Sequence, residues 1–126
     1  MTVGEVMHAG IISCRPETTL RTVAGILAAH RIHAVVVAAA DADAGWSVVS
    51  DRDVVRSHSR GELDQVTAGQ AASEPTLTVR EDADLQHAAE LMDHYGTSHL
   101  IVTASGGGRP TGILSSLDLA AAVARA

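Results

Sequence analysis

The 126-residue chain contains no phenylalanine and no lysine, and its aromatic rings are limited to Trp46 and Tyr95 apart from histidine. Its hydrophobic core therefore has to be built from valine, isoleucine, leucine and alanine, which favour close backbone packing over deep aromatic pockets. A single cysteine, Cys14, excludes an intrachain disulfide bond and suits a reducing compartment. The apolar fraction of 46% is enough for one compact globule, or for two small subdomains that share a core.

All nine basic residues are arginines, no run of basic residues occurs, and the net charge is −6. This pattern gives no footprint for nucleic acid and mainly supports solubility. No apolar stretch approaches the roughly 20 residues that cross a bilayer. The first residues also lack the basic and apolar regions of a signal peptide. We therefore expect a cytoplasmic protein that binds neither nucleic acid nor a membrane.

A gapless internal repeat with an offset of 65 residues is the strongest feature of the sequence. The matched pairs include Val6 and Ala71, Leu20 and Leu85, Ala24 and Ala89, Val49 and Leu114, and Asp53 and Asp118. One register that holds from a helix through strands to a turn predicts two copies of one structural unit. We place the first copy at residues 1–62 and the second at 66–126.

Each copy is expected to contain a short first helix, a short strand, a second helix, two further strands and a closing helix. Apolar residues at helical spacing predict the helices, and the β-branched run Val35–Val37 predicts a buried strand. The first copy is assigned a helix at 3–8, a strand at 12–14, a helix at 19–30, strands at 35–37 and 46–49, and a helix at 50–59. The second copy is assigned a helix at 83–95, strands at 99–103 and 112–114, and a helix at 115–124, with glycine-containing hairpin loops at 41–45 and 106–108.

The linker at 60–65 is polar and too short to separate two independent domains, so we expect the copies to pack together. The last helix is apolar almost all round, with Leu117, Leu119 and Val123 among its residues. A helix without a polar face needs cover on more than one side. We therefore predict a homodimer.

A short motif ends each copy. It consists of a glycine, two apolar residues and a serine in succession, with an aspartate three positions after the serine. The second copy carries it in full at 112–118, whereas Ser47 replaces the glycine at 47–53. With this motif, the element order and the repeat, nearly the whole chain resembles a pair of CBS domains, known as a Bateman module. The resemblance implies an α/β fold of two β-α-β-β-α repeats packed with pseudo-two-fold symmetry. It also implies a regulatory module that needs no cofactor and binds an adenosine nucleotide such as AMP, ADP or ATP.

The motif suits a nucleotide because a helix N-terminus attracts phosphate, a serine hydroxyl donates to phosphate oxygens, and a carboxylate accepts from ribose hydroxyls. The resemblance places Ser50 and Ser115 at phosphate, and Asp53 and Asp118 at ribose. It further places Ser13, Thr78, Ile12 and Leu77 along the cleft, and Val36 and Ile101 beside the base.

An alternative stays open, because serine followed three residues later by aspartate is also an ordinary helix N-cap. Basic residues that could hold phosphates are few. They are Arg31, Arg52 and Arg56 in the first copy and Arg109 and Arg125 in the second. This scarcity favours a monophosphate or diphosphate over ATP.

The remaining reactive side chains predict neither a metal site nor catalysis. The seven histidines do not follow the repeat, and no cysteine or carboxylate cluster has zinc spacing. Cys14 matches Val79, an apolar strand position, which predicts a buried, inert thiol. No Ser-His-Asp arrangement, P-loop or dinucleotide motif is recognisable, so an enzyme is not expected. The leading hypothesis is a nucleotide sensor that signals to an unidentified protein effector by conformational change, and the alternative is a ligand-free structural or interaction module that dimerises.

Overall fold

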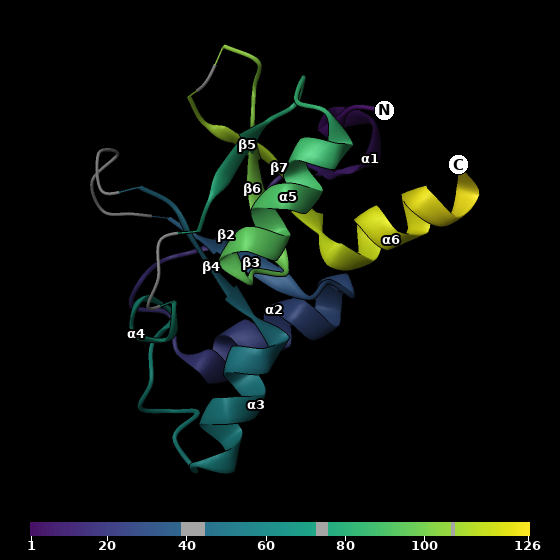
Figure 1. Cartoon of the computed structure of the whole chain (residues 1–126). Helices are drawn as coiled ribbons and strands as arrows, with labels where there is room; N and C mark the ends of the chain where they lie inside the picture. The colour runs from purple at the N-terminus through teal and green to yellow at the C-terminus, as the bar shows by residue number, and fades with distance from the viewer. Residues whose placement is uncertain (39–44, 73–75, 107) are drawn as a thin grey trace. The chain divides into compact units, whose positions relative to one another are not determined.

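A computed structural model describes residues 1–38, 45–72, 76–106 and 108–126 (Figure 1). The chain divides into two compact units, a terminal unit of Met1–Ile11 and Thr76–Ala126 and a central unit of Ile12–Pro75. Each unit combines a small sheet with helices. The predicted mixed α/β fold, built from repeated units, is confirmed.

The central unit has a sheet in the order β2-β3-β4, with β2 parallel and β4 antiparallel to β3. Its elements are β2 (Ser13–Cys14), α2 (Leu20–His30), β3 (Ala34–Val37), β4 (Ser47–Ser50), α3 (Asp51–Ser59) and α4 (Ala68–Ala71). The α2 residues Leu20, Val23 and Leu27 recur at helical spacing and are buried, so this stripe faces the core. The core also contains Cys14, Val35, Val37, Val49 and Ala68.

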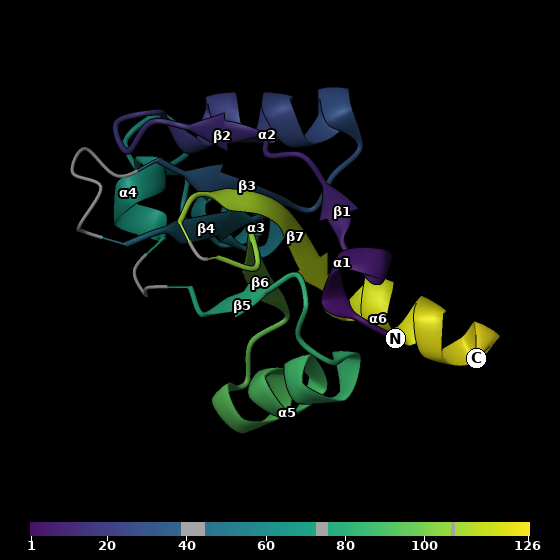
Figure 2. The ribbon, with the colours of Figure 1, turned by 90° about the horizontal axis from the view of Figure 1, so that it is seen from above.

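The terminal unit has a sheet in the order β1-β7-β6-β5 (Figure 2). Its elements are α1 (Val3–Val6), β1 (His8–Ala9), β5 (Thr78–Arg80), α5 (Leu85–Tyr95), β6 (His99–Thr103), β7 (Pro110–Ser115) and α6 (Ser116–Arg125). Alternate residues of β6 point into a core shared with α5 and α6, because side chains alternate across a strand. This core contains Val3, Val79, Leu85, Ala88, Met92, Leu100, Val102, Leu114 and Ala122.

The short first helix of each sequence copy folds with the other copy. In the terminal unit the backbone N–H of Val3 donates to the carbonyl of Ala83 at 2.9 Å. In the central unit the matched residue, Ala68, donates to Thr18 at 2.7 Å, and Thr18 matches Ala83. The next residue of each helix, a glycine, makes a second matched bond of 2.8 Å. The compact units therefore divide the chain differently from the sequence repeat, through a reciprocal exchange.

The helix predicted over 3–8 is two residues shorter in the structure. The helix stops at Val6, and His8–Ala9 forms β1, which pairs with β7 in antiparallel fashion. Gly112 makes this pairing possible, because a Cβ there would run into the His8 carbonyl oxygen and lie 2.8 Å from Met7 Sδ. In the first copy Ser47 holds the matched position, and the stretch that matches β1, residues 73–74, lies outside the described residues.

The other predicted elements are present, with ends that shift by one or two residues. The predicted hairpin loops lie partly outside the described residues, since 41–44 and 107 are not placed. Among the described helices, none has the length and apolar character that a membrane span requires.

Candidate functional site

The start of α3 carries the first copy of the motif. Ser50 and Asp53 form a capping box, in which Asp53 Oδ2 accepts from the Ser50 backbone N–H at 2.8 Å and from Ser50 Oγ at 3.2 Å. The other carboxylate oxygen accepts from Arg56 Nη1 at 3.3 Å. Only 16% of the Asp53 side chain is exposed, so this carboxylate is fixed in orientation by the cap and by the arginine.

The start of α6 carries the second copy. Asp118 Oδ2 accepts from the Ser115 backbone N–H at 3.0 Å, and Ser115 Oγ accepts from the Asp118 backbone N–H at 3.1 Å. Asp118 Oδ1 lies 3.7 Å from His8 Nδ1, a side chain supplied by β1. The N-cap interpretation is thus confirmed for both motifs. The aspartates differ in the side chain that they pair with, which is Arg56 for Asp53 and His8 for Asp118.

The strand residues of the predicted site come together within each unit. In the central unit Ser13 pairs in register with Val36, and the Val36 backbone N–H donates to the Ile12 carbonyl. In the terminal unit Thr78 pairs with Ile101, and the Ile101 backbone N–H donates to the Leu77 carbonyl. Val36 and Ile101 are fully buried, whereas Ser13 and Thr78 are exposed. Both buried residues lie on the face of their strand opposite to the core residues on either side of them.

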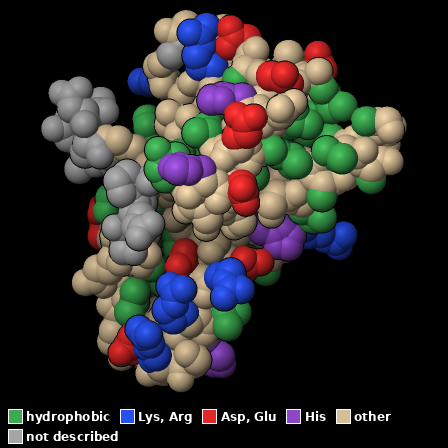
Figure 3. Space-filling model, viewed as in Figure 1, with side chains coloured by type: hydrophobic (Ala, Val, Ile, Leu, Met, Phe, Trp, Pro, Cys, Tyr) green, Lys and Arg blue, Asp and Glu red, His purple; other side chains and the backbone are tan. Residues whose placement is uncertain are grey.

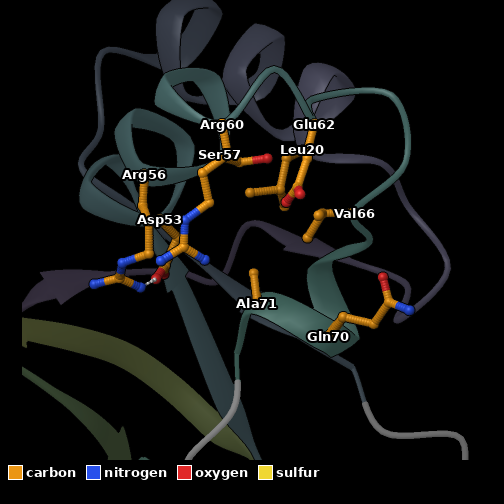
Figure 4. Close-up of a pocket in the computed structure, with 9 residues that line it drawn as sticks. All are labelled: Leu20, Asp53, Arg56, Ser57, Arg60, Glu62, Val66, Gln70 and Ala71. Atoms are coloured by element: carbon orange, nitrogen blue, oxygen red, sulfur yellow. Dashed lines mark hydrogen bonds and ion pairs between the residues drawn. The ribbon is translucent and has the colours of Figure 1, made fainter.

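A cavity of about 420 Å³ lies in the central unit between α3, α4 and the start of α2 (Figure 4). The residues that line it are Leu20, Asp53, Arg56, Ser57, Arg60, Glu62, Val66, Gln70 and Ala71. Two guanidinium groups and two carboxylates thus surround apolar side chains, and Arg56 and Arg60 reach toward Asp53. Of these lining residues, Asp53 was predicted as a binding residue, and Arg56 was recognised as a possible phosphate ligand.

The sequence interpretation missed Ser57 and Arg60, although a signal for both exists. Positions 53, 57 and 60 follow one another at spacings of four and three residues, which places their side chains on one face of a helix. On the surface shown in Figure 3, arginine side chains gather over α3. A search for polar residues in register with Asp53 would have found this face.

Two of the lining side chains lack partners. Ser57 is 5% exposed, and its buried hydroxyl has no hydrogen-bond partner among the described residues. A buried polar group left unpaired costs about 1–3 kcal/mol. The Arg60 guanidinium likewise forms no ion pair or hydrogen bond within the described part of the chain. The Arg60 side chain is therefore a donor that the described residues leave unused, whereas the Ser57 hydroxyl is closed to solvent.

Cys14 lies in the core of the central unit, as predicted. Burial raises the pKa of its thiol, and a hydrogen bond with Thr18 partly opposes this rise. A thiol with a raised pKa is a poor nucleophile at neutral pH. Across the described residues, no three His, Cys, Asp or Glu side chains are grouped so as to hold a metal ion.

Comparisons with known proteins agree with this architecture. The family model for the CBS domain matches residues 3–60 and 68–125. An uncharacterized protein of Methanopyrus kandleri is 30% identical over 121 residues, which cover 94% of this chain and 61% of that longer protein. A CBS domain protein of Pyrobaculum aerophilum, solved in complex with AMP, is 28% identical, with a TM-score of 0.81 and 100% of both chains covered.

The CBS-domain containing protein ATU1752 from Agrobacterium tumefaciens is 25% identical, with a TM-score of 0.79, and the match covers 97% of this chain and 98% of that one. The two family matches together account for most of the sequence, and each contains one copy of the repeat and one capping motif. The chain therefore belongs to the CBS domain family and contains two CBS domains.

Proposed function

We propose that the chain is a regulatory CBS pair that binds an adenosine nucleotide in its central unit. The observation that carries the proposal is that Asp53, the aspartate of the CBS motif, lines a cavity together with Arg56 and Arg60. The volume of about 420 Å³ falls within the roughly 300–1,000 Å³ of small-molecule sites. The AMP complex of the similar protein from Pyrobaculum aerophilum supports this ligand class.

Asp53 can accept further hydrogen bonds. Its carboxylate takes bonds from Ser50 and Arg56, but an ionised carboxylate has about four lone-pair sites. A ribose hydroxyl can therefore donate to it without breaking the cap. Binding regulates a partner protein if the ligand has different affinities for two states of the module, because a ligand shifts an equilibrium only by that difference.

Thermal unfolding in the presence of AMP, ADP, ATP or S-adenosylmethionine tests the proposal. A nucleotide that binds the folded state must raise the melting temperature, and Asp53→Ala should abolish that rise. Asp51→Ala is the matched control, since Asp51 is on the same helix turn but pairs with His33 at 2.9 Å and does not line the cavity. No rise with any nucleotide would contradict the proposal and favour a ligand-free interaction module. Chromatography of the incubated nucleotide separates binding from catalysis, because a regulatory module leaves it unchanged.

We also propose that the chain forms a homodimer through α6. Leu117 and Val123 on this helix are 66% and 59% exposed, which leaves apolar surface uncovered in the single chain. Light scattering should give twice the chain mass of 13.0 kDa, and Leu117→Glu should reduce it to a single chain. A single-chain mass for the unmodified protein would contradict self-association.

A further inference from the structure

One wall of the cavity is a segment that follows α3 in the chain. This wall segment, residues 62–71, leads from the end of α3 through α4 and contributes the lining residues Glu62, Val66, Gln70 and Ala71. In Figure 4, Val66 and Gln70 lie on the opposite side of the cavity from Arg56. The position of the wall segment therefore sets the width of the cavity, although the segment carries no residue of the CBS motif.

The wall segment is held by the first turn of α2. The backbone N–H of Leu20 donates to the Val66 carbonyl at 3.0 Å, and that of Arg21 donates to the Leu63 carbonyl at 3.1 Å. The side chains of Leu63 and Val66 are half-buried and pack against the core of the central unit. Leu20 itself lines the cavity, so α2 and the wall segment meet at the cavity surface.

An ion pair adds a side-chain contact to these backbone bonds. Arg21 Nε donates to Asp64 Oδ1 at 2.6 Å, and Arg21 Nη2 donates to Asp64 Oδ2 at 3.1 Å. A guanidinium that binds both oxygens of a carboxylate fixes the direction of its partner as well as the distance. Neither residue lines the cavity, and the second copy has Gln86 at the position that matches Arg21. The pair thus has no function as a ligand contact and acts on the wall segment.

We infer that Arg21 and Asp64 are positioning residues for the nucleotide site, because their ion pair holds the wall segment where the ligand needs it. This inference rests on the proposed function, since it concerns the cavity in which the nucleotide is proposed to bind. A ligand that requires one position of the wall binds more weakly when the wall is free to move, because binding must then also order the segment. Both side chains are 63% exposed, so the effect on affinity is small, about two- to fivefold.

Calorimetric titration with AMP tests the inference in Asp64→Asn and in Arg21→Gln. Each variant should raise the Kd for AMP by about two- to fivefold. The exchanged pair, Arg21→Asp with Asp64→Arg, should recover most of this loss, which a purely local structural defect would not do. Asp82→Asn is the matched control and should leave the Kd unchanged. Asp82 forms a similar two-bond pair with Arg80, at 3.0 and 2.9 Å, in the terminal unit.

Hydrogen exchange of the ligand-free protein gives a readout that needs no nucleotide. The Arg21 amide, which donates to the wall segment, should exchange faster in Asp64→Asn than in Asp82→Asn. The Ile101 amide, which donates to Leu77 in the terminal unit, should exchange alike in both. An unchanged Kd in Asp64→Asn, or an equal rise in Asp82→Asn, would overturn the inference while the proposed function stands. Failure of the unmodified protein to bind AMP would instead remove the proposed function, and the inference with it.

Discussion

The two units start from one repeated sequence and differ in their closing helices. In the central unit α3 carries Arg56 and Ser57, where α6 of the terminal unit carries Ala121 and Ala122. Ala122 is buried in the core of its unit, whereas the two α3 residues line a cavity. Both helices begin at a serine whose backbone N–H donates to the aspartate three residues later. The motif therefore fixes where the helix begins, and the residues one turn later decide whether polar side chains line a cavity beside it.

One edge of the terminal sheet depends on a single residue, Gly112. In the terminal unit β1 pairs with β7 across Gly112, and β1 supplies the histidine next to Asp118. In the central unit, the described residues give β4 one partner, β3, and Ser47 stands at the glycine position. A glycine in a strand often marks the close approach of another backbone segment.

The core positions Leu100 and Val35 match in the repeat and are both fully buried. Leu100→Ala should lower the free energy of unfolding by about 2–5 kcal/mol, because it leaves a cavity in the terminal unit. Val35→Ala removes fewer carbon atoms from the central unit and should cost less. Urea unfolding of both variants measures the difference. A loss for Leu100→Ala smaller than that for Val35→Ala would contradict the assigned cores.

Gly112→Ala should destabilise the terminal unit by about 1–3 kcal/mol, since the new methyl group has no room beside the His8 carbonyl. Ser47→Ala, at the matched position, is the control and should change stability by less than about 0.5 kcal/mol. Thermal unfolding followed by circular dichroism reports both. Equal effects at the two positions would show that the glycine is not needed for the pairing of β1 with β7.

The two caps should contribute alike despite the different neighbours of their aspartates. Ser50→Ala and Ser115→Ala should each lower the stability of the ligand-free protein by about 1 kcal/mol. Chemical denaturation in the absence of nucleotide provides the measurement. A neutral effect at either position would contradict the capping boxes, and would leave the serine free for another role.

The smallest expected effect concerns an ion pair with no matched pair in the repeat. Arg21 Nε lies 2.6 Å from Asp64 Oδ1, and the hydrogen bond from Arg21 lowers the pKa of Asp64. A lowered pKa means that the pair stabilises the folded state above the ordinary aspartate pKa of about 3.9. This contribution is lost as the pH falls through the lowered value. Asp64→Asn should therefore reduce the acid sensitivity of stability, and an unchanged pH profile would show that the pair contributes nothing.

The periodic features of the sequence predicted most of the fold. The apolar stripe of α2, the buried run of β3 and the caps at Ser50 and Ser115 are local patterns that determine an element from its own residues. The exchange of the short helices could not be predicted, because the bonds from Val3 to Ala83 join residues that are far apart in the chain. Two copies of one unit offer equivalent partners, so the repeat alone does not say which partner is used.

The candidate site was predicted in part for a related reason. The motif identified Asp53, but the cavity also depends on the segment from Glu62 to Ala71, which folds back against α3. No local pattern shows that this segment approaches the helix. The unpartnered state of Ser57 is likewise a property of packing, since an isolated helix would leave its hydroxyl in water.

Calorimetric titration of the intact chain with AMP tests most directly the claim that the two copies differ in function. We expect one AMP bound per chain, with binding lost in Asp53→Ala. Two equivalent AMP molecules per chain, or full binding in Asp53→Ala, would contradict it and would show that the arginines of α3 do not distinguish the central unit from the terminal one.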